Sequence, residues 1–512
     1  MNWSLLASSY GAVFGNVQVL LMTFLGALGG VLLGAIPGMT ATMGVALLIP
    51  FSFGMDLIPS IGLLLGIYCG GMYGGSISAI LIHAPGTPAA AATLLDGYPM
   101  CQKGQAGKAL SVAMFASFVG GVIGALIMTF LSPIIADMAM NFGPGEMFML
   151  AVFGLSVIVA ISGKSIAKGL VSAFFGMLLC TVGLDPTNGI PRFITYKQTG
   201  LLEGFQFIPT LIGLFAVTEV FKQTDPKKKR LSAEDGVSGG KVNTKMPSLK
   251  EIWSIKWTML RCSVVGTVVG ILPGAGATIA SFMCYTMETK LSKHPEKFGT
   301  GCAEGIVAPE SANNAVCGGA LIPMMTLGIP GDTITAMLMS GLIVHGLAPG
   351  ASLFSSNPEV IGTIYFAYIL ACIAMYVMYL LFLKYFIKIL STPMNYMMPV
   401  ILLMCLIGAL TTNNRVFDIW VFFAMGVLGY VFQRVDIPIA PLTLGYVLGP
   451  TVELNFRTAI MTFKGDALSL FTRPLALVLL AVAVIMLFWP MIKNTIQRKK
   501  KVQVGGDSDG TN

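Results

Sequence analysis

The sequence predicts an all-α polytopic membrane protein with roughly 10–12 spans, including re-entrant or broken helices, arranged as two inverted repeats. Composition is the first reason: 55% of the residues are hydrophobic and 11% are charged, whereas about a quarter of the residues in soluble domains are charged. A Pro-Gly motif that occurs twice is the second reason. The distribution of Lys and Arg, which places matching loops on opposite faces, is the third.

Two kinds of helix break recur in the same order in the two halves of the chain. Residues 34–43 read GAIPGMTATM, and residues 270–279 read GILPGAGATI, each inside a long apolar stretch. A second break follows each copy, APGTP at residues 84–88 and GIPGDT at residues 328–333. The repeated order indicates an internal duplication.

Pro-Gly pairs inside membrane-length helices have a structural cost. Pro lacks a backbone N–H and Gly weakens a helix interior, so each pair leaves backbone amides and carbonyls unpaired. Hydrocarbon cannot satisfy these groups, and such breaks therefore occur only where protein or a water-filled cavity covers them. Paired breaks at corresponding positions of two halves indicate the binding site of a transporter.

The charge distribution divides the chain into four segments. Residues 1–221 form the first transmembrane repeat, 222–257 a basic linker, 258–491 the second repeat and 492–512 a basic tail. The linker includes the run Lys227–Arg230, and the net charge of the chain is +8. Positive charge beside membrane spans marks the cytoplasmic side, so we expect linker and tail in the cytoplasm and no binding of nucleic acid.

The same rule orients the loops in each repeat. Lys103 and Lys108 are expected inside, and the loop around Asp137, which lacks Lys and Arg, outside. In the second half, the run Ser263–Tyr285 begins and ends beside cytoplasmic Lys residues, so we interpret it as a re-entrant hairpin with its tip at Pro273-Gly274. The first-half counterpart would then enter from the outside, although Val17–Ile36 is long enough to cross alone, which leaves the orientation of the N-terminus open.

The residues at the breaks are the candidate binding residues. Amides at a helix start, with the positive end of the helix dipole behind them, suit a small carboxylate, and hydroxyl and carbonyl oxygens suit a dehydrated cation. The alternative is that Thr and Asp at these positions only cap helices. The candidate substrate-binding residues are Gly38, Thr40, Pro85, Gly86, Thr87, Gly274, Asn313, Asn314, Pro330, Gly331 and Thr333. The candidate ion-binding residues are Thr42, Thr278 and Asp332.

Other polar residues carry weaker signals. Glu304 and Glu310 lie between the breaks of the second half, where acidic groups at membrane depth usually face a pathway, although Glu304 could lie at the interface. His83 precedes a break and could contact substrate or be structural. The nine Cys and three His residues form no metal-binding pattern. We therefore expect no cofactor other than a coupling ion, Na⁺ or H⁺.

These motifs also resemble a known family. GIYCGGMYGGSI at residues 66–77, the following Pro85–Pro88 and LDGYP at residues 95–99 are similar to the signature block of the large membrane subunit of tripartite tricarboxylate transporters, the TctA family. The second-half motifs, the length and the central linker match as well. Ser78 and His83 depart from the pattern, in which Pro and Asn are expected.

The resemblance implies a multi-pass permease of the bacterial inner membrane, with no enzymatic activity. It also implies two protein partners, a small membrane subunit and a periplasmic binding protein that delivers citrate or a related carboxylate. An ion gradient, with Na⁺ favoured, would drive uptake. The alternatives are a stand-alone proton-coupled anion transporter or a channel. An intramembrane enzyme would need a catalytic dyad inside a span, which the sequence does not show.

The topology can be tested by labelling single introduced cysteines in intact cells. An impermeant reagent should modify a cysteine in the Asp137 loop and should spare cysteines near Lys228 and Lys500, because the positive-inside rule places both basic segments in the cytoplasm. Labelling of the linker together with protection of the Asp137 loop would reverse the orientation.

Overall fold

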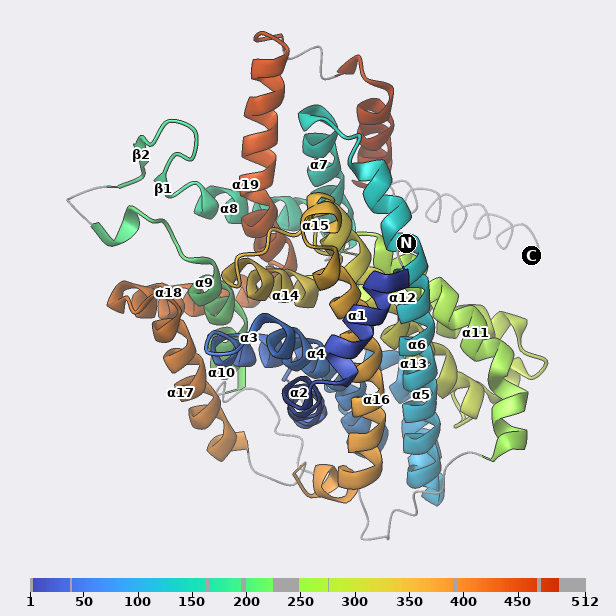
Figure 1. Cartoon of the computed structure of the whole chain (residues 1–512). Coiled ribbons are helices and arrows are strands. Elements are labelled where there is room, and N and C mark those ends of the chain that lie inside the picture. The colour runs from blue at the N-terminus through green and yellow to red at the C-terminus, as the bar shows by residue number, and fades with distance from the viewer. Residues whose placement is uncertain are drawn as a thin grey trace, which may run out of the picture. The chain divides into compact units, whose positions relative to one another are not determined.

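The computed structural model describes residues 3–36, 39–161, 165–194, 199–223, 248–274, 276–389, 394–466 and 471–487. These residues are mostly helical, and β1 and β2 form one short antiparallel pair, which confirms the predicted all-α class (Figure 1). Most of the linker and the whole tail lie outside the described residues. The main elements are α1 (Trp3–Phe14), α2 (Val17–Ala35), α3 (Ala41–Ser52), α4 (Leu57–Ile82), α5 (Ala90–Met100), α6 (Ala106–Ala139), α7 (Pro144–Ile161), α8 (Ile166–Cys180), β1 (Gly183–Leu184), β2 (Pro191–Arg192), α9 (Phe207–Ile212), α10 (Thr218–Gln223), α11 (Leu249–Ile271), α12 (Gly276–Leu291), α13 (Ala303–Leu327), α14 (Thr333–Val344), α15 (Ser352–Ser356), α16 (Pro358–Ile389), α17 (Met394–Asn413), α18 (Val416–Arg434) and α19 (Ile439–Thr462).

The chain forms two compact units, and each combines segments from both predicted repeats. Unit 1 contains residues 1–141 and 205–431, and unit 2 contains residues 142–204 and 432–512. The compact units therefore do not follow the sequence boundaries of the repeats at residues 221 and 258. All four predicted helix breaks belong to unit 1.

Unit 1 contains the same series of elements twice. In the first half the order is α2, break, α3, α4, break, α5 and α6. In the second half it is α11, break, α12, α13, break, α14 and, after the short α15, α16. Both members of each pair of breaks occur where the sequence predicts them.

Equivalent helices of the two halves run in opposite directions. α6 and α16 lie side by side in Figure 1 and are joined at two points. Ser111 Oγ is 2.9 Å from the Tyr379 hydroxyl, and Ser132 Oγ is 2.5 Å from the Tyr365 hydroxyl. Residue numbers rise along α6 and fall along α16 between these two contacts, so the helices are antiparallel.

The same holds for α4 and α13. Ser76 contacts Glu310, whereas Leu64, earlier on α4, shares a small apolar cavity with Leu321, later on α13. The repeats are therefore inverted, as predicted.

Glycines allow the helix before the first break of each repeat, α2 or α11, to lie directly on the backbone of the long helix between the two breaks, α4 or α13. A Cβ atom on Gly30 of α2 would lie 2.5 Å from the Ile67 carbonyl oxygen of α4, and one on Gly266 of α11 would lie 2.4 Å from the Ala312 carbonyl oxygen of α13. Close backbone approach through small residues is the usual way in which helices associate in membranes.

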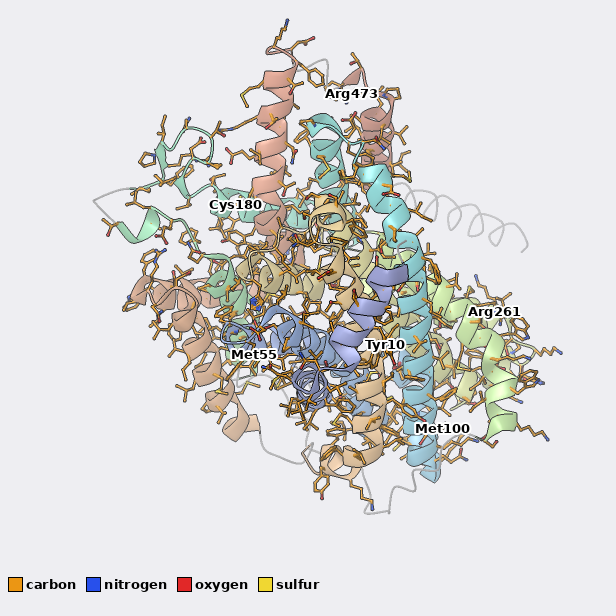
Figure 2. The ribbon with its side chains drawn as sticks, viewed as in Figure 1. Tyr10, Met55, Met100, Cys180, Arg261 and Arg473 are labelled. Carbon is orange, nitrogen blue, oxygen red and sulfur yellow. The ribbon has the colours of Figure 1, made fainter. Side chains whose placement is uncertain are left out.

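The run predicted as a hairpin folds as one. α11 ends at Ile271, Leu272–Gly274 form the described part of the tip, and α12 returns antiparallel to α11. Arg261 of α11, which is labelled in Figure 2, binds Glu288 of α12 through Nε at 2.9 Å and Nη2 at 2.7 Å, and Thr258 donates to the same carboxylate at 3.0 Å. These bonds fix the register of the two arms. That both arms of this hairpin begin and end on the same face of the membrane stays a prediction.

Within the described residues, five helical stretches are long and apolar enough to cross a membrane. Several further apolar helices have 10–17 residues, fewer than the roughly 20 that a full crossing needs, as expected of broken helices. The full-length candidates are Val17–Ala35, Leu57–Ile82, Ala90–Ala139, Pro358–Phe386 and Val416–Arg434.

By hydropathy, the segment Ile437–Leu448, which carries two prolines, is expected to be a marginal crossing. In the structure, residues 439–448 form the first part of α19, a helix of 24 residues. Pro438 precedes the helix and Pro441 lies in its first turn, where a backbone N–H would have no intrahelical partner, so neither Pro interrupts it. The prolines therefore mark the start of a helix and not a weak span.

In unit 2, charged residues join α19 to the loop that carries β1 and β2. Arg457 Nη1 lies 2.8 Å from Asp185 Oδ2, and Arg192 Nη1 lies 2.7 Å from Glu453 Oε1. The pKa of Asp185 is lowered, first by the hydrogen bond from the Thr187 backbone N–H and then by Arg457. This network fixes the loop on α19.

Gly30→Ala should destabilise the protein, whereas Gly29→Ala on the same helix should not. The Cβ at residue 30 would collide with backbone, and at residue 29 it would meet no atom within 4 Å. We expect a cost of about 1–3 kcal/mol for the overpacked variant and a neutral or slightly stabilising effect for the control. Thermal unfolding in detergent measures both, and equal midpoints would show that the α2–α4 contact is not tight.

Candidate functional site

The second break of each repeat begins with the same backbone geometry. α4 and α13 end in residues with left-handed conformation, His83 with φ 55° and Gly328 with φ 66°, and each N–H donates to a carbonyl five residues back. A side chain in this conformation is strained, and Asn tolerates it better than His. The His83 ring packs on the Tyr98 ring with centroids 4.5 Å apart. His83 is thus a helix terminator with a ring contact inside its own half.

After these turns the chain lies directly on the helix that it has just left. Gly86 N–H donates to the Gly75 carbonyl of α4 at 3.1 Å, and a Cβ on Gly86 would lie 2.0 Å from the Gly34 carbonyl oxygen. A Cβ on Gly331 would lie 2.6 Å from Cα of Ala320 on α13. Both predicted glycines are therefore required by close backbone approach.

The breaks also contact one another. Gly274 N–H, at the hairpin tip of the second repeat, donates to the Gly331 carbonyl at 2.6 Å. Thr42 on α3 and Thr333 at the start of α14 have hydroxyl oxygens 3.3 Å apart, which joins the two repeats. The structure thus brings four of the predicted residues together in unit 1. Gly38 lies outside the described residues.

Several of the predicted polar residues cap helices. Asp332 accepts from the Thr335 backbone N–H at 2.7 Å and forms a reciprocal capping box at the start of α14. Thr40 accepts from the Met43 backbone N–H at 3.3 Å and caps α3. Thr278 lies half-buried in the first turn of α12. The alternative capping role thus describes Asp332 and Thr40 in this conformation.

Asp332 has a further partner that the sequence did not reveal. The Tyr68 hydroxyl of α4, which is fully buried, donates to Asp332 Oδ2 at 3.1 Å. A residue of the central helix of one repeat therefore reaches the second break of the other. No local signal marks this contact, because it depends on how α4 and α13 cross.

Asn313 occupies in α13 the position that Tyr68 occupies in α4. Each stands fourteen residues before the last residue of its helix, Leu327 or Ile82. By the inverted symmetry, the equivalent of Asp332 is Thr87, because Pro330-Gly331 matches Pro85-Gly86. The two repeats therefore present a Tyr–Asp pair at one break and the residue types Asn and Thr at the other.

The side chains of this second pair lack hydrogen-bond partners. Among the described residues, the buried side-chain atoms with no partner include Thr87 Oγ1, Ser311 Oγ and both Nδ2 and Oδ1 of Asn313. Asn313 and Ser311 are 0% exposed and Thr87 is 4% exposed. Buried polar atoms are almost always paired, so these unpaired atoms, one at a helix break and the others inside α13, indicate groups that bind a ligand or water.

The neighbouring candidates are paired within the protein. Asn314 Nδ2 donates to the Glu310 carbonyl at 3.2 Å, and Tyr368 donates to the Asn314 carbonyl at 3.1 Å. Glu304 accepts from Ser292 at 2.7 Å and is half-buried near the start of α13, which fits the interfacial alternative. Pro85 is half-buried and Pro330 is buried.

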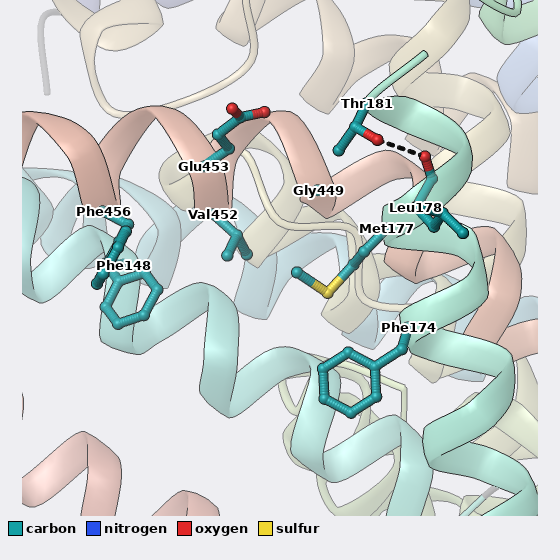
Figure 3. Close-up of a pocket in the computed structure, with 9 residues that line it drawn as sticks. All are labelled: Phe148, Phe174, Met177, Leu178, Thr181, Gly449, Val452, Glu453 and Phe456. Carbon is teal, nitrogen blue, oxygen red and sulfur yellow. Dashed lines mark hydrogen bonds between the residues drawn. The ribbon is translucent and has the colours of Figure 1, made fainter. Parts of the chain in front are cut away.

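A cavity in unit 2 has the wrong chemistry for a carboxylate. Its volume is about 470 Å³, and Figure 3 shows Phe148, Phe174 and Met177 around it, from α7 and α8. Its acidic residue, Glu453, is paired with Arg192 and Arg457. None of the residues predicted from the sequence lines it, so the helix breaks of unit 1 remain the candidate site.

Inverted repeats, helices broken in pairs and a buried, unpaired hydroxyl at one break are together typical of a membrane transporter. The chain belongs to the tripartite tricarboxylate transporter TctA family, whose model matches residues 20–444.

Two relatives come from Agrobacterium vitis. An uncharacterized 52.8 kDa protein in the TAR-I ttuC′ 3′ region is 36% identical over 484 residues, which cover 94% of this chain and 95% of the relative. An uncharacterized protein in the TAR-II ttuC′ 3′ region is 35% identical over 242 residues, 47% of this chain and 100% of the relative. No solved structure matches the chain.

Proposed function

We propose that this chain is the permease subunit of a bacterial inner-membrane system that takes up a tricarboxylate or a related carboxylate. A periplasmic binding protein delivers the substrate, a small membrane subunit completes the complex, and an ion gradient, with Na⁺ favoured over H⁺, drives uptake. Membership of the TctA family supports the tripartite assembly. The unpaired side chain of Asn313 is the observation that carries the proposed binding site.

The two breaks differ in charge, and this difference supports a different ligand for each. At the start of α14 the carboxylate of Asp332 already accepts a hydrogen bond from the Thr335 backbone N–H, which a bound anion would otherwise use. The negative charge of Asp332 also repels a second carboxylate. At the equivalent position of the first repeat Thr87 is neutral, and its hydroxyl is unpaired. We therefore place the substrate carboxylate at Thr87 and Asn313, which offer a hydroxyl and an amide NH₂ as donors.

The coupling ion fits the opposite break. Asp332 supplies a carboxylate at 9% exposure, and Thr42 and Thr333 supply hydroxyl oxygens 3.3 Å apart at the junction of the repeats. Oxygen ligands of this kind, together with carbonyls freed at a broken helix, hold Na⁺ in other transporters with broken helices. Substrate and ion would thus occupy breaks that belong to one packed unit, so each can favour the binding of the other.

Asn313→Leu should weaken substrate affinity. The change removes both polar atoms at similar volume, and loss of a hydrogen bond to a charged group costs about 1.5–3 kcal/mol, which corresponds to roughly 10- to 150-fold in the half-saturating concentration. The measurement is uptake of labelled citrate and other carboxylates into vesicles that carry the full tripartite system. Asn455→Leu, whose amide bonds its own helix at Thr451, is the matched control. Equal affinities in both variants would remove Asn313 from the site.

Thr42→Val and Thr278→Val should each raise the Na⁺ concentration needed for half-maximal uptake, because each removes an oxygen and keeps the volume. Thr326→Val is the control, since that hydroxyl donates to the carbonyl of Ile322 in its own helix. Unchanged Na⁺ dependence in both test variants would mean that these threonines have only structural roles. Full uptake in the absence of Na⁺ would instead favour H⁺ as the coupling ion.

A further inference from the structure

Glu310 is a buried carboxylate at the junction of four helices. It belongs to α13 and is 0% exposed. Within the described chain, three hydroxyls donate to it, one from each of three other helices: Ser76 of α4 at 2.5 Å, Thr93 of α5, and Ser117 of α6 at 2.8 Å. Ser76 and Thr93 share Oε1, and Ser117 donates to Oε2.

No cation balances this carboxylate within the described residues. The salt bridges of Lys and Arg there involve other acids, such as Glu288, Glu146 and Asp185. An isolated buried charge is expensive, and in a membrane protein such a group usually marks an ion pathway. Hydroxyls moderate the cost but carry no charge, so the group needs a mobile cation to become neutral.

The other titratable groups around Glu310 do not neutralise it. Tyr73 of α4 interacts with it electrostatically, and Tyr379 of α16 packs edge-on against Tyr73. Asp96 of α5 is also buried, but it accepts from the Tyr285 hydroxyl and from the backbone amides of Gly299, Gly301 and Cys302. Asp96 is thus a structural carboxylate that fixes the start of α13, whereas Glu310 has only side-chain hydroxyls.

The hydroxyl shell suits a site that is alternately occupied and empty. A hydroxyl can donate to an ionised carboxylate or turn and accept from a protonated one, and its oxygen can also coordinate a metal cation. Loading of the carboxylate therefore requires rotation of hydroxyls and no new ligand from the protein.

The position of the cluster links it to the helix breaks. Ser76 follows Gly75, whose carbonyl holds Gly86 of the first break. Glu310 lies one turn before Asn313 on α13, and Thr93 lies in the first turn of α5, directly after that break. A change of charge at Glu310 would thus act on both elements that flank the proposed carboxylate site.

We propose that Glu310, with Ser76, Thr93 and Ser117, is a second cation site, which binds one monovalent cation, H⁺ or Na⁺, in each transport cycle. The inference rests on the proposed function only for its role in coupling. Cation binding itself is a property of the chain alone and can be measured without a carboxylate substrate or a partner protein.

The first test measures thermal unfolding of the purified full-length chain against pH and, separately, against Na⁺ replaced by choline at constant ionic strength. A ligand that binds only the folded state raises the midpoint. The wild type should be stabilised by Na⁺ if Na⁺ is the occupant, and by acid pH if H⁺ is. Glu310→Gln, which resembles the neutral state, should lose the part of that response that Glu310 supplies and keep only what the proposed ion site at Asp332 contributes, whereas Thr326→Val should keep the full response.

Two further variants keep the test decisive if Glu310→Gln does not fold. Ser117→Ala and Thr93→Val each remove one hydroxyl and should shift the Na⁺ concentration or the pH of half-maximal stabilisation by about 3- to 10-fold, the effect of roughly one hydrogen bond. Responses identical to the wild type in all folded variants would overturn the site.

The second test separates coupling from transport. In vesicles with the full system, Glu310→Gln should retain exchange of labelled for unlabelled substrate, which needs no gradient, and should lose at least about tenfold in gradient-driven accumulation. If the wild type transported no carboxylate, the proposed function would fail while the unfolding test still decided the cation site. If accumulation in Glu310→Gln equalled that of the wild type, the site would not take part in coupling.

Discussion

The packing of unit 1 depends on one constraint: backbone amides and carbonyls at interrupted helices must find hydrogen-bond partners or close contacts within the protein. A Pro-Gly break frees amides and carbonyls that a bilayer cannot hydrate. Here the freed segments lie on the backbone of α4 or α13: the Gly86 N–H donates to the Gly75 carbonyl of α4, and Gly331 lies against Ala320 of α13. Contact at this distance is possible only without side chains, which is why glycines accompany the prolines.

Close helix packing and hydroxyl contacts hold the two repeats together. Gly30 and Gly266 bring α2 and α11 onto the central helices of their own halves. α6 and α16 then pair antiparallel through hydroxyl contacts at both ends. The result is a scaffold in which equivalent elements run in opposite directions and both pairs of breaks are enclosed by one packed unit.

The proposed binding sites lie where equivalent positions of the two repeats carry different residues. Tyr68 and Asp332 form a closed, hydrogen-bonded pair, whereas the equivalent residues Asn313 and Thr87 have unpaired atoms. One break is acidic and the other neutral, and the proposal of separate cation and anion sites rests on this difference. Glu310 adds a carboxylate whose counterpart by the same symmetry, Leu65, is apolar.

The sequence by itself determined the class of protein, the four helix breaks and the inverted order of the repeats. These depend on hydropathy, on the loss of a backbone donor at Pro and on the placement of Lys and Arg, all of which act locally. It could also identify the family, because the motif around residues 66–77 is contiguous.

Only the tertiary structure decided which candidate side chains have hydrogen-bond partners within the protein. Asp332 and Thr40 became caps, Asn314 bonded its own helix, and Asn313 was left unpaired. The contacts of Glu310 join residues 193 to 234 positions apart in the chain. Such contacts depend on the rotation and register of helices against one another, and a spacing pattern within one helix carries no information about either.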